Sequence, residues 1–60
     1  MSEDSTRRLL RAFGIAVTDL EDALEANQVE QARRAAQALR ERLKEVVELA
    51  ERLAERASKL

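Results

Sequence analysis

The sequence predicts an all-α protein: a two-helix antiparallel hairpin that assembles as a homodimeric four-helix bundle or a coiled-coil-like oligomer. Three observations support this prediction. Apolar residues recur in alternating steps of three and four along two stretches, and no proline interrupts either stretch. The composition is also rich in Ala, Leu, Glu, Arg and Gln, which favour helices. The 60 residues suffice for one small domain, 1–60.

The first apolar stripe predicts a helix over about 5–26. It consists of Leu10, Phe13, Val17, Leu20 and Leu24, and it is broadened by Leu9, Ala16 and Ala23. Such spacing places these side chains on one face of a helix. The same face offers a surface for packing against another helix.

The second stripe predicts a helix over about 28–58. Its members are Val29, Ala32, Ala36, Leu39, Leu43, Val46, Ala50, Leu53, Ala57 and Leu60. This stripe restarts five residues after Leu24, which rotates it by roughly 140° at about 100° per residue. A turn near Asn27 resolves the conflict, because asparagine readily adopts the left-handed conformation that ends helices.

The order of charges also favours an antiparallel hairpin. The first helix begins with a basic stretch and ends with an acidic one, so the acidic end is expected to face Arg33 and Arg34. The basic start is expected to face Glu41, Glu45 and Glu48. Exposed ion pairs contribute about 0–1 kcal/mol each, so they select orientation more than they stabilise.

Small residues suggest where the helices approach closely. Ala32, Ala35 and Ala36 crowd the start of the second helix, opposite the larger side chains of the first. Gly14 lies inside the first helix, where it costs about 1 kcal/mol relative to Ala. A close helix crossing or a slight kink in the bundle is expected at that glycine.

The second helix is longer than the first, which predicts self-association. Beyond the level of Ser5, the apolar residues Leu53, Ala57 and Leu60 have no partner in their own chain, so a second copy is expected to cover them. The expected oligomer interface comprises Leu10, Phe13, Val17, Leu20, Leu24, Leu39, Leu43, Val46, Leu49, Leu53 and Leu60. A higher-order bundle and a different helical protein as partner remain alternatives.

The residue types available exclude several kinds of chemistry. The chain has no His or Cys, so zinc sites, haem ligation and Cys or His nucleophiles are absent. Its carboxylates lie off the apolar stripes, and one glycine cannot form a phosphate-binding loop. The sequence therefore predicts a non-enzymatic protein with no catalytic, cofactor or metal residues.

Arginine clusters provide the basis for an alternative function. Six residues form the candidate nucleic-acid contact: Arg7, Arg8, Arg11, Arg33, Arg34 and Arg40. The expected architecture is similar to that of the Rop-type RNA-binding dimers, and a dimer would double each cluster. Interleaved acidic residues, a net charge of −1 and the lack of residues suited to base stacking favour a protein partner instead.

The sequence thus predicts a small self-associating scaffold, adaptor or regulatory interaction module, with a nucleic-acid-binding dimer as the alternative. Its longest strongly apolar run, residues 12–17, is too short to span a bilayer, so no membrane partner is expected. The absence of cysteine fits a reducing compartment, and a cytoplasmic location is expected.

Overall fold

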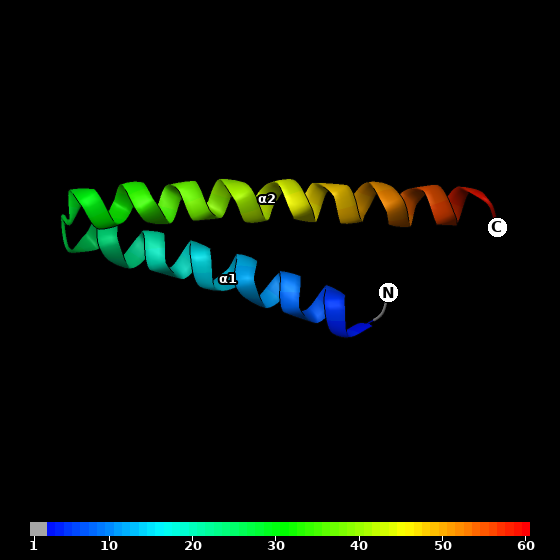
Figure 1. Ribbon diagram of the computed structural model, residues 1–60, viewed down its shortest axis with the longest axis horizontal. Coiled ribbons are helices and arrows are strands. Elements are labelled where there is room, and N and C mark those ends of the chain that lie inside the picture. The colour runs from blue at the N-terminus through cyan, green and yellow to red at the C-terminus, as the bar shows by residue number, and fades with distance from the viewer. Residues whose placement is uncertain (1–2) are drawn as a thin grey trace.

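The structure is a computed structural model that describes residues 3–60. It contains two helices, α1 (Glu3–Glu25) and α2 (Val29–Ser58), and no strand within the described residues. The all-helical prediction is confirmed. The helices run in opposite directions from a short turn and form an elongated hairpin, 48 × 17 × 13 Å in extent (Figure 1). Helix α1 ends one residue earlier than expected, and α2 starts one residue later.

The turn is formed by backbone hydrogen bonds around one left-handed residue. Asn27 has a φ of 58° and is the one described non-glycine residue with positive φ. The N–H of Gln28 donates to the carbonyl of Ala23 over 2.9 Å, and the N–H of Asn27 donates to Leu24 over 3.2 Å. This pair of bonds is the Schellman motif, which satisfies the last carbonyls of a helix. The asparagine therefore acts as predicted.

Helix α2 begins without a side-chain cap. Gln28 occupies the N-cap position with extended backbone angles, and its side chain makes no capping hydrogen bond. Its carbonyl still accepts the N–H of Ala32 over 2.8 Å, which starts the helical ladder. Glu30 supplies negative charge in the first turn, where the helix dipole favours it.

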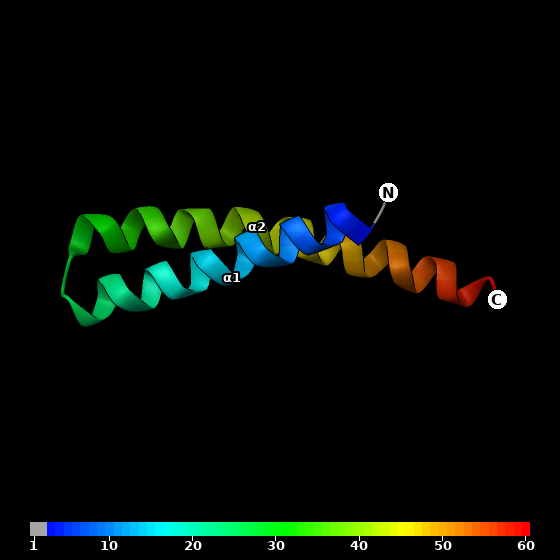
Figure 2. The same cartoon turned by 90° about the horizontal axis from the view of Figure 1, so that it is seen from below.

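The two helices lie close together near the turn and separate toward the N-terminal end of α1 (Figure 1). In the perpendicular view the start of α1 crosses over α2 (Figure 2). Ala32, Ala35 and Ala36 are half-buried at the close end, where small side chains permit a short separation. Leu9 and Leu49 are half-buried at the open end, where larger side chains keep the helices apart.

The contact between the helices contains little buried surface. Ala16 and Ala23, each 6% exposed, are the only described residues classed as buried, and α2 has none. The sequence predicted these alanines at the edge of the first stripe, with Leu10 and Leu24 at its centre. The structure reverses this order, because Leu10 and Leu24 stay 49% and 60% exposed. The α1 stripe is rotated so that its smallest members face α2.

Contacts within the single chain explain neither Gly14 nor the order of charges. Gly14 is exposed, and a Cβ atom built there would meet nothing within 4 Å, so no close crossing within the hairpin requires it. The ion pairs of the described residues lie along α2 and its C-cap residue rather than across the hairpin. They join Arg42 to Glu45 at 2.9 Å and Lys59 to Glu55 at 3.6 Å.

Candidate self-association surface

Apolar residues on each helix form two adjacent stripes. The inner stripe faces the other helix and includes Leu9, Ala16 and Ala23 on α1 and Ala35 and Leu49 on α2, all buried or half-buried. An outer stripe lies beside it on each helix. Each outer residue follows an inner position by one residue, which is a rotation of about 100° around the helix. The outer stripes comprise Leu10, Val17 and Leu24 on α1 and Val29, Ala36, Leu43 and Ala50 on α2.

The two outer stripes lie on the same side of the hairpin. On each helix the outer stripe is displaced from the inner one in the same rotational sense, because both follow the same heptad order. In antiparallel helices an equal rotation in the same sense turns both stripes toward one face. We call this surface the apolar face, with Val47 at its edge.

The side chains of the apolar face are accessible. Leu10, Leu24, Val29 and Leu43 all count among the exposed large hydrophobic residues, and Leu43 is 46% exposed. Phe13, Leu20, Leu39 and Val46 lie between the inner and outer stripes and are half-buried. A second layer of helices on the apolar face would cover both groups, as in a four-helix bundle.

The end of α2 extends past the start of α1 in both views (Figures 1 and 2). We call residues 50–60 the overhang. Leu60 is fully exposed, as expected for a residue with no partner in its own chain. Leu53 is 49% exposed, but it lines a cleft together with Ser5, Thr6 and Leu9, so the start of α1 lies beside it, which the sequence did not predict. Leu49 and Val47 precede the overhang and differ in exposure. The structure separates them, because Leu49 is half-buried on the inner side and Val47 is exposed.

The predicted interface residues therefore fall into two sets. Leu10, Leu24, Leu43, Leu53 and Leu60 are exposed, and Phe13, Val17, Leu20, Leu39, Val46 and Leu49 are half-buried. Leu49 is better explained by the contact within the hairpin. Val29 and Val47 were not in the predicted interface set, although both are exposed. Their apolar character and helical spacing were the available signals.

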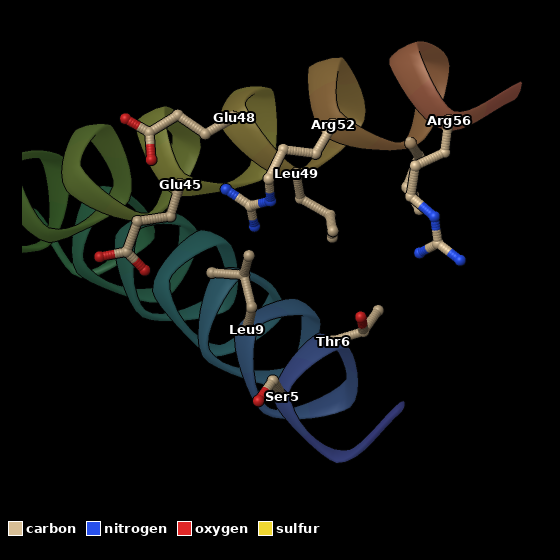
Figure 3. A pocket seen from close by; sticks show the side chains of 9 residues that line it. Ser5, Thr6, Leu9, Glu45, Glu48, Leu49, Arg52 and Arg56 are labelled. Atoms are coloured by element: carbon tan, nitrogen blue, oxygen red, sulfur yellow. The ribbon is translucent and has the colours of Figure 1, made fainter. Parts of the chain in front are cut away.

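A cleft opens between the start of α1 and the overhang, with a volume of about 610 Å³. Leu9 and Leu49 point toward one another across it, and Glu45, Glu48 and Arg52 form its α2 wall (Figure 3). These charged residues lie on the opposite side of α2 from Leu43 at 100° per residue. The cleft and the apolar face are therefore separate surfaces.

The hairpin separates the arginines of the alternative function. Arg7, Arg8 and Arg11 lie near the start of α1, whereas Arg33 and Arg34 lie next to the turn, at the other end of the molecule. All six candidate arginines, Arg40 included, are exposed. The structure thus brings no two of the clusters together into one basic patch within the chain.

Other features of the described chain define no chemical site. Neither helix is long and apolar enough to cross a membrane, and no group of three or more His, Cys, Asp or Glu within 3–60 could hold a metal ion. Comparison with known proteins found no matching protein-family model, no matching curated protein and no matching solved structure. The apolar face and the overhang are therefore the features of the described chain that bear on function.

Proposed function

We propose that the protein is a non-enzymatic, self-associating helical interaction module that acts as a scaffold, adaptor or regulator. The observation that carries this proposal is the small core of the single hairpin. Two alanines are its only buried residues in the described chain, and no large side chain is fully buried. A 60-residue hairpin stabilised so weakly needs further burial, and the chain contains no disulfide to substitute for it.

The exposed surface supports the same proposal. Five leucines, two valines and Ile15 remain exposed, and most of them lie on one face of the hairpin. Completing the burial of one half-exposed leucine contributes on the order of 1 kcal/mol, about half the value for full burial. Because both helices contribute to the apolar face, a partner would bury many such side chains at once. Folding and assembly are therefore expected to be coupled.

The experiment is sedimentation equilibrium combined with circular dichroism over a wide range of protein concentration. The wild-type chain is expected to sediment above 6.8 kDa, with helicity and melting temperature rising with concentration. Leu43→Asp should dissociate or unfold the assembly, because it introduces a charge into the apolar face. Ile15→Asp is the matched control, since Ile15 is 54% exposed but lies on the far side of α1.

The proposal makes a clear distinction between these variants. A wild-type chain that is fully helical and monomeric at every concentration would contradict it. Equal effects of Leu43→Asp and Ile15→Asp would contradict the assignment of the apolar face, because both variants replace an exposed apolar residue with the same charge.

A further inference from the structure

We infer that the partner on the apolar face is a second copy of this chain with its turn at the same end, so that each α1 lies against α2 of the other copy. This inference rests on the proposed self-association and specifies its geometry. The two turns would lie side by side, and the two overhangs would leave the bundle together at the other end.

The heights of the apolar residues fit this arrangement. With the turn at Asn27, Leu10 lies at the height of Lys44 and Leu24 at the height of Glu30 in their own hairpin. A second copy with its turn at the same end keeps these heights. Leu10 then meets Leu43 of the second copy, and Leu24 meets Val29, each within one residue. All four side chains are exposed in the single chain.

Charges at the rim of the apolar face are complementary in the same register. Glu21 flanks the outer stripe of α1 between Val17 and Leu24, and Arg33 flanks that of α2 between Val29 and Ala36. The same-end arrangement brings Glu21 to the height of Arg33 of the second copy. Glu51 of the second copy lies about one helical turn from Arg7 in height, whereas Arg11 comes level with Leu43 and Lys44, so the complementary rim contact is that of Glu21 with Arg33. Complementary rim charges select orientation and register.

The alternative arrangement, with the two turns at opposite ends of the bundle, cannot both cover the overhang and bring opposite charges together. It pairs α1 with α1 and α2 with α2. A register centred on Leu43 sets Val29 against Ala57 and covers the overhang, but it places the two copies of Arg11 face to face. Sliding the copies until Arg7 meets the acidic end of α1 leaves Leu60 beyond the turn of the second copy. The opposite-end arrangement therefore loses the contact of Glu21 with Arg33 in every register, and in the second register it also leaves the overhang uncovered.

The overhang has a pattern that suits a parallel pair. From Val46 its apolar residues recur in steps of four, three, four and three, through Ala50, Leu53, Ala57 and Leu60. This is the heptad pattern of a two-stranded coiled coil. In the same-end arrangement the two α2 helices occupy diagonal corners of the bundle. Past the start of α1 their overhangs run parallel and in register, and they cover each other by converging there. One geometry thus accounts for the apolar face, its rim charges and the overhang.

Disulfide cross-linking tests this orientation, because the chain contains no cysteine of its own. Four single-cysteine variants are oxidised at a concentration where the wild type is assembled, and again in denaturant as a measure of random collision. The geometry predicts that Leu53→Cys links to itself and that Leu10→Cys links to Leu43→Cys when the two variants are mixed. Ile15→Cys is the control that should not link above the level in denaturant.

The outcomes separate this inference from the proposed function. Self-linking of Leu43→Cys together with unlinked Leu53→Cys would overturn the same-end geometry while leaving self-association intact. Monomeric sedimentation of the wild type, with no variant linking above the level in denaturant, would overturn both. Linking of Leu53→Cys to itself and of Leu10→Cys to Leu43→Cys supports the orientation proposed here.

Discussion

The backbone N–H of Gln28 donates to the carbonyl of Ala23 over 2.9 Å, across a residue with a φ of 58°. This bond reverses the chain with backbone groups alone, since the side chain of Gln28 makes no capping hydrogen bond. The turn sets the relative height of every pair of residues on α1 and α2. The register of the apolar face therefore depends on the conformation of Asn27.

Replacement of Asn27 provides a direct test of the turn. Asn27→Ala should lower the free energy of unfolding by about 1 kcal/mol, because alanine tolerates the left-handed conformation less well than asparagine. Asn27→Gly should preserve or raise it, since glycine has no Cβ to clash. Chemical denaturation at one fixed protein concentration measures both. Equal losses for alanine and glycine would show that the left-handed conformation is not what the asparagine supplies.

Gly14 offers a test of the outer side of α1. A Cβ atom there meets open space in the single chain, so Gly14→Ala should raise the free energy of unfolding by about 0.5–1 kcal/mol through helix propensity alone. Thr18 donates its hydroxyl to the Gly14 carbonyl over 3.1 Å, and this bond uses no side chain of residue 14. Thermal melts at matched concentration measure the change. A loss of stability would instead indicate that another backbone approaches Gly14 in the assembly.

The secondary structure could be predicted from the sequence because two local signals agree. Alternating steps of three and four identify both helices, and the five-residue shift after Leu24 identifies the turn. The rotation of the α1 stripe could not be predicted in this way. One apolar set on α1 is Leu9, Ala16 and Ala23, and the other consists of their neighbours Leu10, Val17 and Leu24. Periodicity alone does not say which set faces α2. Packing against alanines near the turn decides it, and that depends on the paired surfaces.

Cross-hairpin ion pairs were expected because the order of charges along the chain places opposite charges at the same end of the hairpin. This order does not determine which side chains meet. Opposite charges do face the same half of the hairpin, but long exposed side chains have no fixed partner there. Arg42 instead contacts Glu45 one turn away on its own helix, at 2.9 Å. Surface pairs of this kind contribute little to stability. The order of charges therefore predicted the orientation of the helices but not the individual ion pairs.

The separation of the arginine clusters predicts weak and unspecific nucleic-acid binding. Titration of a mixed RNA and DNA pool at low salt should give no mobility shift at micromolar protein that depends on Arg33 and Arg34. The physical reason is that their basic charge lies beside the acidic end of α1 and far from Arg7, Arg8 and Arg11. A shift that disappears in an Arg33→Gln, Arg34→Gln double variant, with assembly unchanged, would favour the nucleic-acid-binding alternative instead.

Leu53 provides the most direct test of the overhang. It is 49% exposed in the single chain, at the cleft beside the start of α1, so a charge at this position keeps its access to water unless a helix of another chain covers it. Leu53→Asp should dissociate or unfold the assembly, since burying an unpaired carboxylate costs on the order of 2 kcal/mol or more. Leu53→Met is the control, because an apolar side chain of similar volume typically costs less than about 1.5 kcal/mol even in a packed core. Sedimentation and helicity are measured for both variants. An aspartate variant with unchanged mass and unchanged helicity would show that nothing covers the overhang.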